Sequence, residues 1–355
     1  MDERIYELDG QGDITFLLYD VPKSLPRTLD QLEPRMLNGS KPESTSPPEE
    51  KEEETNQKPQ SVLKIRASSK HLTLSSPQFA RTLHSGFQGS HDLQKTGHLE
   101  LKIENWDPAA FLALMLILHG RTRLVPREMT LSKLADFAVL VDYYECYEVV
   151  EVFTDMWLGG LRMWSWLPTS LAQAEKALFT AWVFQHRQMF EGACRYLRGN
   201  LTARFCCELP VPRRVCGMFY QPLVRAGQGL MQLDAIDRTR EDAVGRILDR
   251  LHDRVALLRS DNVQCSYECD CVLLGALTRH MHRLRILERP APPFEGIGVE
   301  QLAKEAASVV VPGWYERGSY IEHSCLATRD FKKSLTCTDN ALLIVDLDKL
   351  TELRR

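Results

Sequence analysis

The chain of 355 residues lacks any long uninterrupted apolar run. Its longest, FLALMLIL at residues 111–118, is far shorter than the roughly 20 residues that a membrane-spanning helix needs. The first residues, MDERIYELDGQGD, are charged and do not contain the apolar core of a secretory signal. We therefore expect an intracellular protein, nuclear and/or cytoplasmic, that has no membrane partner.

A strong excess of charge of either sign is also missing. The chain has 44 Lys and Arg against 48 Asp and Glu, which gives a formal net charge of −4. It has no basic arm and no series of Cys₂His₂ fingers, so nucleic-acid binding is not expected and a transcriptional regulator is a less favoured alternative. Ten cysteines are present, and without a secretory signal we expect reduced thiols or metal ligands rather than disulfides.

Recognisable catalytic motifs are absent as well. Neither a G-x-S-x-G elbow nor a glycine-rich phosphate loop accompanies the serine-rich stretch ASSKHLTLSSPQFARTL, residues 67–83. That stretch instead predicts two short helices, the first capped by Ser68 or Ser69 and the second by Ser75 with Pro77 in its first turn. A thiol enzyme with Cys and His in the C-terminal half is a minor alternative, and we expect that the protein is not an enzyme.

Apolar patterning divides the chain into two domains. Residues 1–160 contain three predicted strands and several helices, and residues 165–355 are predicted to be mainly helical. The stretch 23–60 is rich in Pro, Glu, Ser and Thr and is expected to be a disordered insertion. The predicted strands lie at 13–20, 61–67 and 98–105. The predicted helices lie at 108–120, at 130–161 as a pair, and at about 171–198, 231–260, 270–288 and 298–311.

The order of these segments resembles a BTB/POZ domain. The similarity covers about residues 13–160 and rests on GDITFLLYD, VLKIRA, SSKHLTLSSPQF, HLELKI, WDPAAFLALMLILHG and LADFAVLVDYYECYEVVEVFTDMWL. Leu72, Ser76 and Phe79 occupy the places of the family's Leu and Ser-x-x-Phe pattern. The chain looks most like fungal BTB proteins, in which a Pro/Glu/Ser-rich insertion separates the first two strands. The resemblance implies an α+β fold of short strands capped by a cluster of helices, followed here by an all-α C-terminal domain.

The resemblance also implies a function in protein–protein interaction. BTB domains self-associate, as homodimers for example, or recruit other proteins, and an alternative role is that of substrate adaptor for a cullin-type ubiquitin ligase. Asp13 matches the acidic residue that lies at the dimer interface of relatives. Ser68 and Ser69 stand where those relatives have a basic pair, which argues against a standard dimer. The turn between the last two helices is the other candidate partner-binding surface, formed by Tyr143, Tyr144, Glu145, Tyr147 and Glu148.

A candidate metal site lies in the C-terminal half. Cys265 and Cys269 are four residues apart and would share one face of a helix, and His323 and Cys325 are two apart and would share one side of an extended segment. Together they offer a Cys₃His set suited to structural zinc. The alternative is a group of small buried thiols with a surface histidine. The nearby Cys271 and Cys337 are reserve ligands.

Overall fold

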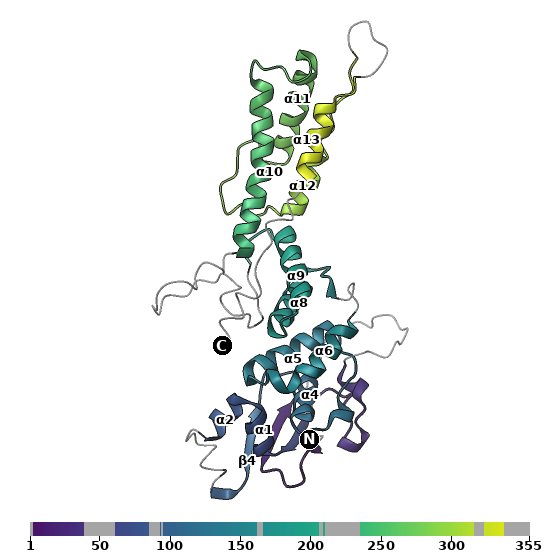
Figure 1. The fold of residues 1–355 in the computed structure, drawn as a ribbon, viewed down its shortest axis with the longest axis vertical. Coiled ribbons are helices and arrows are strands. Elements are labelled where there is room, and N and C mark those ends of the chain that lie inside the picture. Colours follow the sequence, from purple (N-terminus) through teal and green to yellow (C-terminus); the bar gives the residue numbers. More distant parts are fainter. Residues whose placement is uncertain are drawn as a thin grey trace, which may run out of the picture. The chain divides into compact units, whose positions relative to one another are not determined.

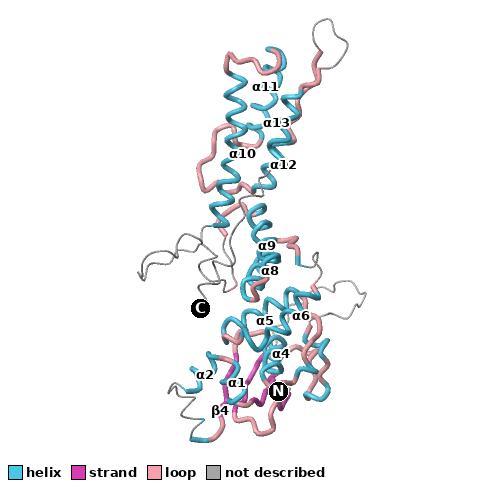
Figure 2. Tube along the Cα trace, viewed as in Figure 1, coloured by secondary structure: helices cyan, strands magenta, loops and turns pink. Residues whose placement is uncertain are grey.

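The structure of the chain is a computed structural model, which describes residues 3–38, 61–84, 93, 95–161, 166–205, 209, 235–315 and 323–336. The chain divides into two compact units. Unit 1 comprises Met1–Leu167 and Lys176–Met189, and unit 2 comprises Pro168–Glu175 and Phe190–Arg355. Residues 176–189, which lie beyond the boundary predicted from the sequence, therefore group with unit 1. Figure 2 shows that the strands lie in the N-terminal part of the chain and that the described part of unit 2 is helical.

Unit 1 is an α+β unit built on one four-stranded sheet. Its strands are β1 (Glu3–Glu7), β2 (Ile14–Tyr19), β3 (Val62–Ala67) and β4 (Leu99–Ile103), in the order β1-β3-β2-β4. The central pair β2 and β3 is antiparallel, and the edge strands β1 and β4 each run parallel to their neighbour. The sequence predicted the inner pair and β4 but not β1, which has five residues and alternates exposed with buried positions.

The segment after β2 is folded as far as residue 38, although the sequence predicted disorder from residue 23. It contains two short 3₁₀ turns, Leu29–Gln31 and Pro34–Leu37, and it buries three leucines, Leu25, Leu32 and Leu37. The buried guanidinium of Arg4 in β1 holds the segment by donating to two of its backbone carbonyls, each at 2.7 Å. The rest of the predicted insertion, residues 39–60, lies outside the described residues.

Among the described residues before Leu167, the sheet is accompanied by helices α1 (Ser69–Ser75), α2 (Pro77–His84), α4 (Pro108–Leu118), α5 (Leu131–Tyr144) and α6 (Tyr147–Gly160). Helix α4 is at the centre of the core (Figure 1). Asp107 caps α4 by accepting the Ala110 N–H at 2.8 Å, and every residue of α4 after Pro108 is buried. The Phe111 ring of α4 meets the Phe16 ring of β2 edge-on at 5.2 Å. Helix α4 has no polar face because it is buried on all sides within unit 1.

The serine-rich stretch forms the two predicted short helices. The cap of the second helix is one residue later than predicted, because Ser75 ends α1 and the Ser76 hydroxyl accepts the Phe79 N–H at 3.1 Å. No serine of this stretch therefore has to be explained by catalysis.

The next predicted helix, at about 171–198, is interrupted. The structure has α8 (Leu171–Val183) and α9 (Arg187–Asn200), separated by Gln185, which adopts a left-handed φ of 57°. Neither glycine nor proline marks this break, so the sequence carried no signal for it.

Unit 2 is a helical unit with its own core. Its helices are α10 (Ala235–Arg259), α11 (Tyr267–Arg283), α12 (Val299–Ala307) and α13 (Leu326–Thr336), together with most of α9. Helix α10 packs against α11 and α12, and α12 packs against α13, as Figure 1 shows. The buried side chains between them come from all four helices and include Leu248, Leu251, Leu273, Leu277, Ala306 and Leu335. Among the described residues of the chain, no helix is long and apolar enough to cross a membrane.

Candidate functional site

Two of the four predicted metal ligands lie at the start of α11. Ser266 caps this helix by accepting the Cys269 N–H at 3.2 Å, and the Gln264 N–H donates to Asp270 at 2.7 Å. Cys265 therefore lies just before the helix rather than on its face as predicted. These bonds fix the first turn so that Cys265, which is exposed, and Cys269, which is buried, approach the same point.

The other two ligands lie just before α13. The His323 N–H donates to the Trp314 carbonyl at 2.9 Å, and the two aromatic rings lie 4.6 Å apart between centroids. The carbonyl of Cys325 accepts the Arg329 N–H at 3.3 Å, so Cys325 starts the helical hydrogen bonding of α13. The imidazole and this thiol thus both have defined positions.

The four side chains come together as the sequence predicted. One ligand atom from each of Cys265, Cys269, His323 and Cys325 lies within 4.8 Å of all the others. The Cys265 Sγ and the His323 Nε2 are 3.4 Å apart. Tetrahedral zinc with Zn–S bonds of about 2.3 Å requires its sulfur ligands to be about 3.8 Å apart, so a metal ion fits this cluster after small side-chain adjustments. The Cys₃His cluster can bind a metal ion.

The thiols of the cluster differ in how readily they lose their protons. Burial and the neighbouring Cys325 raise the pKa of Cys269 to about 12, and burial likewise raises the pKa of Cys265. Burial acts in the same direction on Cys325, but hydrogen bonds from the hydroxyl and N–H of Thr328 outweigh it and lower the Cys325 pKa to about 6. Three thiolates close together repel one another, and a divalent cation removes this repulsion as the protons leave.

Of the two reserve ligands, only Cys271 lies among the described residues. Cys271 is exposed on α11 and is not part of the group, and Cys337 lies outside the described residues. Sequence reasoning missed Trp314 and Thr328, which orient His323 and Cys325. No local pattern identifies such supporting residues, because their role depends on a tertiary contact or on where a helix happens to begin.

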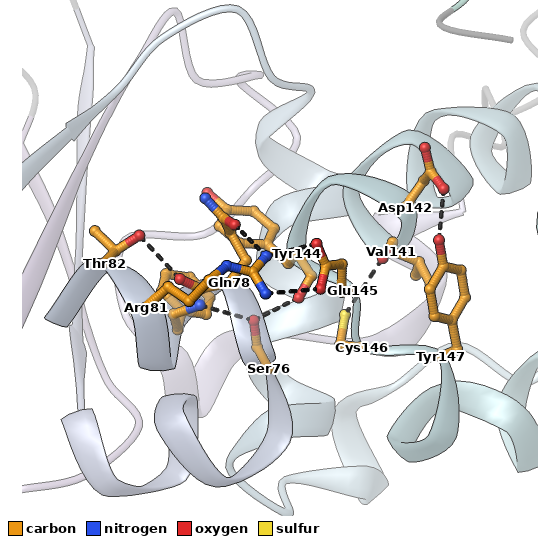
Figure 3. A network of polar contacts seen from close by, with 11 residues as sticks. Ser76, Gln78, Arg81, Thr82, Val141, Asp142, Tyr144, Glu145, Cys146 and Tyr147 are labelled. Carbon is orange, nitrogen blue, oxygen red and sulfur yellow. Dashed lines mark hydrogen bonds and ion pairs between the residues drawn. The ribbon is translucent and has the colours of Figure 1, made fainter. Parts of the chain in front are cut away.

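The candidate partner-binding turn lies where α5 meets α6 (Figure 3). Tyr144 is buried there, with its ring stacked on Phe79 at 4.4 Å between centroids, and its carbonyl accepts the buried Ser76 hydroxyl at 2.5 Å. Its ring is therefore part of the core and is not presented to a partner. The periodicity of the sequence did not reveal this, because consecutive tyrosines end α5 and only one of them faces inward.

The remaining residues of the turn reach the surface. Tyr143 is 52% exposed and packs beside the Trp106 ring at 5.2 Å. Glu145, in the left-handed conformation with φ 55°, accepts two hydrogen bonds from Arg81 of α2, at 2.5 and 3.1 Å (Figure 3). The Tyr147 hydroxyl donates to Asp142. Glu148 is exposed in the first turn of α6. Tyr143, Glu145 and Glu148 thus form an aromatic and acidic surface, called here the α5–α6 surface.

Asp13, the other predicted interface residue, is satisfied within the chain. Its carboxylate accepts the N–H of Ser69 at 2.7 Å and the hydroxyl of the same residue at 2.6 Å. Burial raises its pKa, but these hydrogen bonds lower it by more, so the net shift is downward. Ser69, one of the two serines at the place of the basic pair, thereby supplies the partner of Asp13 and ties the start of β2 to α1.

Comparisons of the chain with models of protein families, with curated proteins and with solved structures gave no match.

Proposed function

We propose that the chain is a protein–protein interaction protein, with an N-terminal BTB/POZ unit that mediates self-association or recruits a partner. The observation that carries the proposal is the order of elements in unit 1. Strands β2 and β3, the helical hairpin α1–α2, strand β4, helix α4 and the pair α5–α6 follow one another as the resemblance to BTB/POZ domains leads us to expect. The residues that resemble the family's pattern, Leu72, Ser76 and Phe79, are all buried in this core.

The α5–α6 surface is the part of unit 1 that we assign to the partner. It combines an exposed aromatic side chain with acidic groups, and aromatic residues are common energetic anchors at interfaces. The side-chain oxygens of Asp13 are occupied by Ser69, so we place recognition at the α5–α6 surface rather than at Asp13.

Co-capture of two differently tagged copies of the full chain, expressed together in the source cells, tests this proposal. We expect recovery of either the second copy or another protein in near-stoichiometric amount, and the double variant Tyr143→Ala, Glu148→Lys to reduce it by at least tenfold. Lys23→Ala, an exposed change on the same unit, should leave recovery unchanged. A cullin as the recovered protein would assign the ubiquitin-ligase adaptor role. Recovery of neither a second copy nor a partner would contradict the proposal.

We also propose that the Cys₃His cluster holds a structural zinc ion. Three thiolates and one imidazole complete a tetrahedral shell and leave no open position for a substrate, which favours a structural rather than a catalytic metal. The ion would join the start of α11 to the start of α13. We expect about one zinc per chain after dialysis, measured by elemental analysis, and a loss of the metal in Cys269→Ser but not in the matched control Cys271→Ser. Zinc far below one per chain in the unmodified protein would contradict the site.

A further inference from the structure

The described residues of unit 2 contain a buried arginine without a partner. Arg198, near the end of α9, is 5% exposed, and its Nε is buried without a hydrogen bond. No described residue forms a hydrogen bond or an ion pair with the rest of its guanidinium. Removal of a cationic group from water is costly unless an opposite charge or several acceptors compensate. Arg198 thus lacks the compensation that a buried arginine normally has.

Three other arginines of the described residues show what such compensation looks like. Arg240 donates to the carbonyls of Pro293, Phe294 and Ile297, and Arg4 donates to two carbonyls. Arg254, which is only partly buried, lies over the Phe331 ring at 5.6 Å, although its Nε and Nη2 are also buried without a hydrogen bond. Each of these guanidinium groups has carbonyls or an aromatic face to offset its charge. All four arginines have a buried Nε without a hydrogen bond, but only Arg198 also lacks a carbonyl acceptor and a ring contact among the described residues.

The groups around Arg198 add positive charge. Burial lowers the pKa of Arg198 most, and Arg195 and Arg246 lower it further, whereas Glu300 alone acts in the opposite direction. Arg195 is exposed on the same helix and Arg246 is partly exposed on α10. The positive charges of three arginines thus stand against the one carboxylate of Glu300, and two of the three, Arg195 and Arg246, have solvent-exposed area.

The start of α12 lies beside the same cluster. The side chain of Glu300, in the first turn of α12, packs so closely on Gly199 that a Cβ at this glycine would lie 2.4 Å from a carboxylate oxygen. Gly298 caps α12 and has no side chain that could accept its first N–H groups. A helix N-terminus has a partial positive charge and favours anions. The N-terminus of α12 and the three arginines therefore both favour the binding of an anion.

We propose that Arg198, together with Arg195 and Arg246, binds a tetrahedral oxyanion of the phosphate type, either the free ion or the phosphate group of a small metabolite. Guanidinium groups form paired charge-assisted hydrogen bonds with such oxyanions, and a bound dianion would offset the excess charge of the cluster. This site lies within unit 2 and is independent of the proposed interaction surface. It also uses none of the proposed zinc ligands.

Calorimetric titration of the full-length protein with inorganic phosphate, at constant ionic strength in chloride buffer, tests the site. We expect saturable binding that is at least about tenfold weaker in both Arg198→Met and Arg195→Gln. Arg279→Gln, an exposed change on α11, is the matched control and should bind like the unmodified protein. A second titration with glycerol 3-phosphate distinguishes the source of the anion, because tighter binding than phosphate assigns a small phosphate ester and equal or weaker binding assigns the free ion.

Thermal unfolding of the same variants separates binding from a structural role. Without phosphate, Arg198→Met should be as stable as the unmodified protein or more stable, because it removes an uncompensated buried charge. Phosphate should raise the unfolding temperature of the unmodified protein but not of this variant. The absence of saturable phosphate binding, or equal binding by Arg198→Met and Arg195→Gln, would overturn the proposal.

Discussion

His119 is a partly buried histidine of unit 1 whose protonation is coupled to folding. Its Nδ1 lies 2.8 Å from the Met115 carbonyl and its Nε2 accepts the Ser68 N–H at 2.9 Å, so the ring is in the neutral form that donates from Nδ1. Burial lowers its pKa below the ordinary 6.5, and the nearby His71 and Arg121 act in the same direction, against the Met115 carbonyl and Asp9. The folded unit thus binds fewer protons than the unfolded chain once the pH falls below about 6.5.

The free energy of unfolding of unit 1 should therefore fall as the pH is lowered from 7.5 to 5.5. We expect His119→Gln to weaken this pH dependence, because an amide can accept the Ser68 N–H but does not titrate. Urea unfolding at several pH values measures it, with His98→Gln, a change at an exposed histidine, as control. Equal pH dependence in the unmodified protein and His119→Gln would contradict this role.

The end of α5 is held in an unusual conformation. Glu145 ends this helix with a left-handed backbone, a position where glycine is the common residue, while its side chain joins α2 through Arg81. Both partners of that ion pair are about half exposed, so the pair contributes little to stability. The glutamate is therefore better explained by its side chain at the α5–α6 surface than by stability.

Substitutions at Glu145 separate the contribution of its left-handed backbone from that of its ion pair with Arg81. Glu145→Gly should leave the free energy of unfolding within about 1 kcal/mol of the original, because relief of backbone strain offsets the lost ion pair. Glu145→Ala keeps the strained φ and should be less stable than Glu145→Gly by about 1 kcal/mol. Equilibrium denaturation in urea measures both variants. An alanine variant as stable as the glycine variant would show that the left-handed conformation is not strained.

Helices and strands with clear sequence patterns were predictable from the sequence. Their exact termini and their tertiary contacts were less predictable. Helix α4 followed from an Asp-Pro start and an apolar run, and the paired short helices followed from serines and a proline. The short edge strand β1 and the helix α13 had no comparable signals. The meeting of Cys265, Cys269, His323 and Cys325 was predictable because cysteine and histidine occur there at short spacings. The lack of a partner for Arg198 was not, because it is a property of tertiary packing.

On the scale of the molecule, the proposed zinc site would connect two distant parts of unit 2. Cys265 and His323 are 58 positions apart in the sequence, and a metal ion bound between them would link the starts of α11 and α13. A ligand that binds only the folded state stabilises it, by about 4 kcal/mol at a concentration 1,000 times its Kd. We therefore expect metal loss to affect unit 2 without affecting the separate core of unit 1.

Hydrogen exchange of the full chain with and without a zinc chelator tests this expectation. Peptides from residues 262–284 and 323–336 should exchange faster after chelation, and peptides from residues 108–160 should not change. The Cys325→Ser variant should behave like the chelated protein even when zinc is supplied, and Cys271→Ser like the unmodified protein. Equally faster hydrogen exchange in both units would mean that the metal does not stabilise unit 2 alone.

The most direct test of the whole account is native mass spectrometry of the full chain purified from its source cells through a tag. We predict complexes heavier than the 40.6 kDa chain, either two or more copies or one copy with another protein, with one zinc ion on each copy. A single 40.6 kDa species with no metal and no partner would contradict both the interaction function and the zinc site.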